Sequence, residues 1–179
     1  MARVLWHVTM SVDGFIAGPG DRLDWMLGFG EENDEVNELL PQIGAILAGR
    51  RTYNVGAVEK RPQFRKPYGG AVDCPVFVLT HHPPTDDPSV TFLQGDIKAA
   101  VKEASRAAGD KYLVIFGADV ARQCIEAGLV EEVLIHMVPV LLGDGVRLFS
   151  RKGADEVHLE LVRVTRAVQV TNLRLDYVG

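Results

Sequence analysis

Short apolar runs that suit β-strands alternate with helical patterns along this chain, and this alternation constrains the fold more than any other feature. We predict strands at residues 4–10, 45–48, 76–80, 90–93, 112–116 and 133–142. We predict helical stretches that start near Glu32, near Arg51, after Asp96 and near Val120. Such alternation is typical of an α/β domain. No composition shift or repeat divides the chain, so residues 1–179 are interpreted as one domain.

Some local details of this prediction are sharp enough to be tested. The apolar positions Val36, Leu39, Leu40 and Ile43 have helical spacing. Asp96 is expected to cap a helix that reaches Ala108, and Gly128 to close the one after it. Pro139 lies inside the run 133–142 and predicts a bulge or a local edge there. The tail alternates apolar and polar residues, which predicts an antiparallel C-terminal hairpin with a bulge at Val162.

Composition and charge exclude several classes of protein. The net charge of −5 provides no basic face for nucleic acid. Cys74 and Cys124 are too few for a disulfide framework, and the five histidines lack the spacing of a metal site. The chain has no signal-peptide pattern and no apolar run of membrane-spanning length. We therefore expect a cytoplasmic protein with reduced thiols, without a metal, nucleic-acid or membrane partner.

The segment Gly49-Arg50-Arg51-Thr52-Tyr53 joins a predicted strand to a predicted helix. Glycine permits a close approach of the backbone to a ligand, and the N-terminus of the helix favours an anion. The arginines and the threonine hydroxyl are suitable donors for phosphate. The alternative is an ordinary strand-to-helix turn with two solvated arginines.

Two further strand ends carry polar or glycine residues. Leu79-Thr80-His81-His82 ends one strand, where polar groups can face a nucleotide. Phe116-Gly117-Ala118-Asp119-Val120 passes directly from an apolar strand into a helix, which suits a diphosphate over the helix N-terminus. The alternatives are a turn with a histidine pair and a tight turn with Asp119 as N-cap. No G-x-G-x-x-G follows the first strand, so the Rossmann fingerprint is absent.

The order of these segments resembles the dihydrofolate-reductase superfamily. The closer resemblance is to the branch that contains the reductase domain of the bifunctional riboflavin-biosynthesis deaminase-reductase and its stand-alone relatives. The residues that carry the resemblance are 10–17 (MSVDGFIA), 48–53 (AGRRTY), 78–80 (VLT), 115–120 (IFGADV), 128–132 (GLVEE), 139–145 (PVLLGDG) and 148–149 (LF). The resemblance implies an α/β fold with a mixed, mainly parallel central sheet, flanking helices and an antiparallel C-terminal hairpin.

The resemblance also implies NADPH as the hydride donor. The residues that it assigns to the cofactor are Thr9, Ile16, Gly49, Arg50, Arg51, Thr52, Leu79, Thr80, His81, Phe116, Gly117, Ala118, Asp119 and Val120. Thr9 and Ile16 would lie near the nicotinamide, and Thr80 and His81 near the adenosine 2′-phosphate. It assigns Trp25, Leu142 and Gly143 to the substrate side. Many relatives have a second glycine at 118, often joined by a cis peptide, where this chain has alanine.

A hydride reductase also needs polar groups for its substrate. Dihydrofolate reductase uses a buried carboxylate, and the matching region here is Glu31 to Glu35. Glu32 is four residues before Val36, so it is the candidate anchor, with Asp34 second; the alternative is a solvated acidic helix start. Asp13 is another candidate catalytic contact, or else a turn residue before Gly14.

The resemblance favours a phosphoribosylamino-pyrimidine as the small heterocyclic substrate. Arg61, Arg65 and Lys66 are candidates for its phosphate. A dihydrofolate or pterin reductase and a non-catalytic NADP-binding module remain alternatives. We expect a homodimer, because relatives pair and the region 133–142 is apolar.

Overall fold

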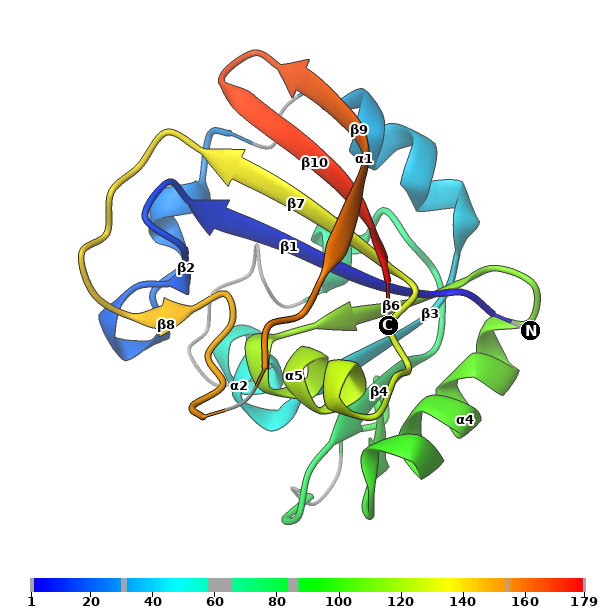
Figure 1. The fold of residues 1–179 in the computed structure, drawn as a ribbon. Helices are drawn as coiled ribbons and strands as arrows, with labels where there is room; N and C mark the ends of the chain where they lie inside the picture. The colour runs from blue at the N-terminus through cyan, green and yellow to red at the C-terminus, as the bar shows by residue number, and fades with distance from the viewer. Residues whose placement is uncertain (1, 30–31, 58–65, 84–86, 154, 179) are drawn as a thin grey trace.

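The centre of the computed structural model is an eight-stranded sheet (Figure 1). The structure describes residues 2–29, 32–57, 66–83, 87–153 and 155–178. The strand order is β5-β4-β3-β6-β1-β7-β10-β9. The bounds of these strands are β1 Val4–Ser11, β3 Ile43–Gly49, β4 Val76–Leu79, β5 Thr91–Leu93, β6 Tyr112–Phe116, β7 Glu132–Val138, β9 Leu159–Ala167 and β10 Val170–Tyr177.

The sheet is mixed and mainly parallel, as the resemblance implies. The strands from β5 to β7 run parallel, whereas β10 is antiparallel to both β7 and β9. A separate antiparallel pair joins β2 (Phe15–Ala17) to β8 (Val146–Arg147). The helices are α1 Asp34–Leu39, α2 Arg50–Ala57, α4 Ile97–Ala108 and α5 Ala118–Glu126, with short 3-10 turns η1 Pro19–Asp21, η2 Asp24–Met26, η3 Leu40–Gln42 and η4 Pro67–Gly70.

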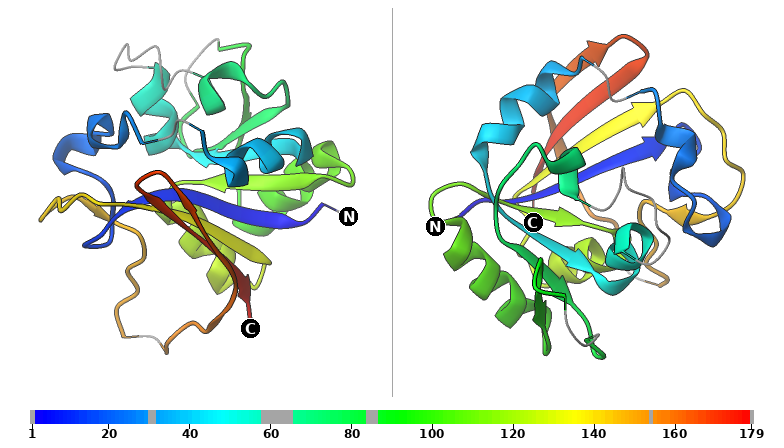
Figure 2. Two further views of the ribbon diagram at one scale, coloured as in Figure 1. Left: turned by 90° about the horizontal axis from the view of Figure 1, so that it is seen from above. Right: turned by 180° about the vertical axis from the view of Figure 1, so that it is seen from behind.

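Apolar side chains cover both faces of the sheet, so the fold has three layers. Alternate residues of a strand point to opposite faces. In β6, Leu113 and Ile115 therefore pack in the cluster with α4 and α5, while Val114 packs in a second cluster with α1. Figure 1 shows α5 crossing in front of the sheet, and the reversed view in Figure 2 brings α1 to the front. Burial on both faces explains why β3 and β6 consist almost entirely of apolar residues.

The close contact between α4 and β3 depends on Gly44. A Cβ atom at this position would lie 2.3 Å from the carbonyl oxygen of Ala108. Any side chain there would push the end of α4 away from the sheet. The helix itself follows the sequence prediction, because the side chain of Asp96 accepts a hydrogen bond from the amide of Ala99 and the helix ends at Ala108.

Several predicted boundaries are wrong, and each has a local reason. The strand predicted over 133–142 ends at Val138, so Pro139 lies outside the ladder and no bulge is needed. The helix predicted from Val120 begins at Ala118, with Gly117 rather than Asp119 as its N-cap. The helical spacing up to Ile43 breaks at η3, and Ile43 begins β3.

The C-terminal hairpin is confirmed, including its irregularity. Arg174 pairs with Arg163, but the next residue, Leu175, pairs with Leu161, so Val162 is the extra residue of a bulge. The segment between α2 and β4 contains η4, and part of this segment lies outside the described residues. No helix in the described ranges is long and apolar enough to cross a membrane.

Candidate functional site

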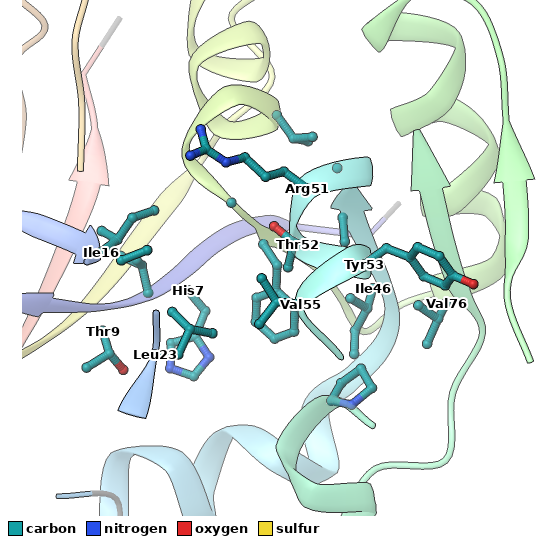
Figure 3. Close-up of a pocket in the computed structure, with 18 of the residues that line it drawn as sticks. His7, Thr9, Ile16, Leu23, Ile46, Arg51, Thr52, Tyr53, Val55 and Val76 are labelled. Carbon is teal, nitrogen blue, oxygen red and sulfur yellow. The ribbon is translucent and has the colours of Figure 1, made fainter. Parts of the chain in front are cut away.

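A large groove runs along the carboxyl ends of β3, β4 and β6 and continues over β1 and β7 (Figure 3). Its volume is about 2280 Å³. A typical small-ligand pocket has roughly 300–1,000 Å³, so this groove has room for a dinucleotide beside a second molecule. All the residues that the sequence assigns to the cofactor line it: Thr9, Ile16, Gly49, Arg50, Arg51, Thr52, Leu79, Thr80, His81, Phe116, Gly117, Ala118, Asp119 and Val120.

The strand ends approach one another most closely at Gly117. A Cβ atom on Gly117 would lie 2.6 Å from the hydroxyl oxygen of Thr52, and the residue has φ +95°. This conformation is almost restricted to glycine. The glycine at the end of β6 therefore has a specific local cause, because a side chain at 117 would collide with the first turn of α2. No peptide bond in the described ranges is cis, so the bond between Gly117 and Ala118 is trans.

Both arginines at the start of α2 have partners. The Arg50 guanidinium donates to the side chain of Asn54 at 2.8 Å and to the carbonyl of His82 at 2.9 Å. Arg51 forms an ion pair with Asp21 at 2.7 Å, and both residues line the groove. Arg50 is thus held between two strand ends, whereas Arg51 is tied to the loop after β2.

Polar groups at the other two strand ends are also fixed. Thr80 is buried, and its hydroxyl accepts a hydrogen bond from the amide of His82. The carboxylate of Asp119 accepts hydrogen bonds from Arg122 and Gln123, both at 2.8 Å. Asp119 therefore turns along its own helix, and its charge is partly neutralised. This arrangement reduces the repulsion that a bare carboxylate would exert on a phosphate.

The residues that the sequence assigns to catalysis or to the substrate do not line this groove. These residues are Asp13, Trp25, Glu32, Asp34, Leu142 and Gly143. Asp13 ties two loops together, because its carboxylate accepts hydrogen bonds from the Ser11 hydroxyl and from the amides of Leu142 and Gly143. These bonds lower the pKa of Asp13 to about 2. The alternative of a turn residue describes it better than a role in catalysis.

The inward position expected for Glu32 is wrong. Helix α1 begins at Asp34 with Asn33 as N-cap, so the helical spacing to Val36 does not extend back to Glu32. Glu32 is exposed with φ +53°, and Asp34 is exposed as well. The buried carboxylate of this helix is Glu35, which binds Arg163 at 2.7 Å and the Thr165 hydroxyl at 3.1 Å. Glu35 does not line the groove.

Sequence reasoning missed a buried polar chain at the β1 end of the groove. The hydroxyl of Tyr68 lies 2.5 Å from His7 Nδ1, and His7 Nε2 lies 2.6 Å from His136 Nε2. His136 Nδ1 in turn lies 2.6 Å from the side-chain oxygen of Asn172. Tyr68, His7 and His136 all line the groove, and Figure 3 shows His7 beside Thr9. We refer to His7 and His136 as the histidine dyad.

Burial disfavours the charged forms of the histidine dyad and of its tyrosine. Desolvation lowers the pKa of His7 well below its ordinary value, and the neighbouring His136 lowers it further. Desolvation also lowers the pKa of His136, although its hydrogen bond to Asn172 opposes the shift. Burial raises the pKa of Tyr68. The signal in the sequence was a single histidine inside each of two apolar strands, where a polar side chain needs a partner.

The sequence analysis also suggested basic residues for a substrate phosphate and an apolar region for a dimer contact. Lys66 lines the groove, while Arg61 and Arg65 lie outside the described residues. No cluster of metal-ligating side chains occurs within the described ranges. The apolar run of β7 is buried between β1 and β10 and provides no outer surface. The exposed apolar side chains instead include Leu161, Val162 and Val164 on the edge strand β9.

The fold and the groove define a class: a dihydrofolate-reductase-like α/β domain with a ligand groove at its parallel strand ends. Within that class, the chain belongs to the RibD C-terminal domain family, whose model matches residues 2–172. It is 27% identical over 149 residues to the Bacillus subtilis protein YwjB, which has no assigned function, with 82% of each chain covered.

Solved structures share this fold. A Shewanella sp. PV-4 protein assigned to riboflavin biosynthesis superposes with a TM-score of 0.80 at 22% identity, with both chains fully covered. The Thermotoga maritima deaminase and 5-amino-6-(5-phosphoribosylamino)uracil reductase has a TM-score of 0.72 at 16% identity, covering 99% of this chain and 57% of that one. Enterococcus faecalis dihydrofolate reductase, complexed with NADP(H), has a TM-score of 0.69 at 17% identity over 99% and 97% of the chains.

Proposed function

We propose that the protein is an NADPH-dependent reductase of the riboflavin-biosynthesis type, which transfers hydride to a phosphoribosylamino-pyrimidine or a related heterocycle. The observation that carries the proposal is the meeting of Gly49–Thr52, Thr80 and Gly117 in one groove. The start of α2 offers backbone amides and guanidinium groups for phosphates. Membership of the RibD C-terminal domain family supports the same reaction class.

The cofactor would occupy the strand ends, with its adenosine 2′-phosphate near Arg50, Thr80 and His81. NADPH supplies a hydride when it is bound. Phe116 and Gly117 would hold the diphosphate, while Thr9 and Ile16 would face the nicotinamide. This proposal assigns the rest of the groove, from Thr9 toward α1 and η4, to the substrate.

The structure of α1 disfavours the dihydrofolate alternative. A pterin reductase of the dihydrofolate type needs a carboxylate that faces its substrate. The buried carboxylate here, Glu35, is neutralised by Arg163 and lies outside the groove. Lys66 lines the groove and remains available for a substrate phosphate. A phosphoribosyl pyrimidine is therefore the preferred substrate.

The test is NADPH oxidation, followed at 340 nm, with the phosphoribosylamino-uracil and with dihydrofolate. We expect turnover with the pyrimidine, little with dihydrofolate, and weaker binding of NADH than of NADPH. NADPH binding without oxidation of either substrate would favour a non-catalytic module. Failure to bind NADPH would overturn the proposal itself.

We also propose that two copies pair through the exposed apolar edge at β9, since among the described residues no strand lies beside this edge in the sheet. An unpaired apolar edge is a template for a second chain. Light scattering of the wild-type protein and of Val164→Lys tests the pairing. A monomeric mass for both proteins would contradict it.

A further inference from the structure

The buried polar chain at the substrate end of the groove has a defined direction. The backbone amide of Glu35 donates to the side-chain oxygen of Asn33, which fixes the orientation of that amide group. Asn33 and Asn172 exchange hydrogen bonds of 2.9 and 3.1 Å, so the orientation of Asn172 is fixed as well. Its side-chain oxygen therefore faces His136 as an acceptor.

The fixed side-chain oxygen of Asn172 determines which ring nitrogen of each histidine in the dyad carries the proton. His136 must carry its proton on Nδ1 to donate to Asn172, because the 2.6 Å contact to that oxygen is much closer than the 3.4 Å contact to the Asn33 amide nitrogen. His136 Nε2 is then an acceptor, so His7 must donate from Nε2. His7 Nδ1 is left to accept the hydroxyl proton of Tyr68. Every proton in the neutral chain points away from the groove.

We propose that Tyr68, His7 and His136 form a proton relay that protonates the acceptor during hydride transfer, with Tyr68 as the group that contacts the substrate. This inference rests on the reductase function proposed above. The relay is suited to a C=N or C=O acceptor, whose nitrogen or oxygen needs one proton when its carbon receives the hydride. The walls around it are apolar and include Val36, Leu40, Ile46 and Val72, which suits a flat heterocycle.

One added proton reverses the two hydrogen bonds that join Tyr68 to His7 and His7 to His136. When His136 is an imidazolium, Nδ1 still donates to Asn172 while Nε2 donates to His7. His7 then carries its proton on Nδ1 and donates to the Tyr68 oxygen. The Tyr68 hydroxyl proton is thereby free to point into the groove, toward the acceptor.

Transfer of the proton to the acceptor returns Tyr68, His7 and His136 to their neutral arrangement. The Tyr68 O–H bond breaks as its proton bonds to the acceptor nitrogen or oxygen. The proton on His7 Nδ1 moves to the Tyr68 oxygen, and the proton on His136 Nε2 moves to His7 Nε2. The hydride from NADPH supplies both electrons, so no group in the relay changes its oxidation state. Solvent in the open groove restores the proton between turnovers.

Charged and titratable groups surround the dyad from each neighbouring element. Glu35 on α1 favours the added proton on His136, whereas Arg174 on β10 opposes protonation of His7. Arg163 on β9 neutralises part of the Glu35 charge, and Cys74, before β4, lies near Tyr68. Because burial disfavours the imidazolium, the charged relay is a strong acid and becomes more populated as pH falls.

The first experiment does not require turnover. Nitrogen-15 NMR of the histidine side chains in the wild-type protein at pH 8 should show His136 protonated on Nδ1 and His7 protonated on Nε2. Lowering the pH should add one proton shared by the pair, with His7 changing to the Nδ1 tautomer in the same step. The opposite tautomers, or independent titration of the two rings, would overturn the relay.

The second experiment uses steady-state turnover with the phosphoribosylamino-uracil. Tyr68→Phe should lower kcat by roughly 100-fold, the usual contribution of a general acid, with the Kd of NADPH unchanged. His136→Gln should flatten the fall of kcat with rising pH. Tyr177→Phe, which removes a hydroxyl outside the groove, is the matched control and should retain full kcat. An unchanged kcat in Tyr68→Phe would overturn the relay and leave the reductase standing.

The two proposals fail in different ways. A wild-type protein that never oxidises NADPH overturns the reductase function, whereas the NMR tautomers still decide whether the proton chain exists. Thermal unfolding of each variant separates loss of structure from loss of proton transfer, because a purely structural role would lower stability without changing the pH profile.

Discussion

Replacement of Gly117 by alanine is expected to damage both folding and cofactor binding. The backbone at φ +95° and ψ 145° costs a non-glycine residue about 1–3 kcal/mol. The new Cβ would lie 2.6 Å from the Thr52 hydroxyl, and overpacking of this kind adds about 1–3 kcal/mol. A combined loss of about 4 kcal/mol should lower the midpoint of thermal unfolding by roughly 8–16 °C. Fluorescence titration should show weaker NADPH binding, because the methyl group occupies the groove.

Two further variants separate the effect of backbone strain from the effect of the collision with Thr52. Gly95→Ala has a comparable φ of +113° with nothing within 4 Å of the new Cβ, so it should show backbone strain alone. Thr52→Ala in the Gly117→Ala background should recover the part of the loss that comes from the collision. If Gly117→Ala were no less stable than Gly95→Ala, and Thr52→Ala recovered nothing, the close approach of these strand ends would be refuted.

Three other predictions concern charged groups. Glu132→Gln removes the carboxylate closest to the half-buried Arg174, at 2.8 Å, and leaves it only the more distant Glu35 at 3.8 Å, so unfolding should become easier by about 3 kcal/mol, as measured by urea denaturation. The lowered pKa of Asp13 stabilises the fold above about pH 4, and this stability is lost as pH falls toward 2; Asp13→Asn should remove that dependence in acid unfolding curves. Asp21→Ala frees Arg51 for the phosphates of the cofactor, so calorimetry should show NADPH binding up to about five-fold more tightly.

The cofactor half of the site was predictable because each of its parts is a short continuous segment, whose pattern is visible in the sequence. Gly49 and Gly117 each follow an apolar strand and precede a helix, and parallel strands necessarily bring such ends to one edge of the sheet. The sequence therefore predicts the groove without knowledge of the strand order. The C-terminal bulge at Val162 was predictable for the same reason, since a phase slip in alternation is visible within one strand.

The substrate half depends on contacts between distant segments, which a single sequence does not reveal. His7 and His136 are 129 residues apart in the chain, and their pairing follows only from β1 and β7 being neighbours. The error at Glu32 has another origin. Helical spacing was extended one turn too far, past the Asn33 cap, so the exposed carboxylate was chosen instead of the buried Glu35.

The position of β1 has a consequence for synthesis on the ribosome. Both edges of β1 are closed by strands made much later, β6 at 112–116 and β7 at 132–138. At ~5–20 residues per second, the nascent β1 waits roughly 6–25 s for its second neighbour. Its apolar side chains stay partly uncovered during that interval, and nascent fragments that stop before β7 have no complete sheet to join.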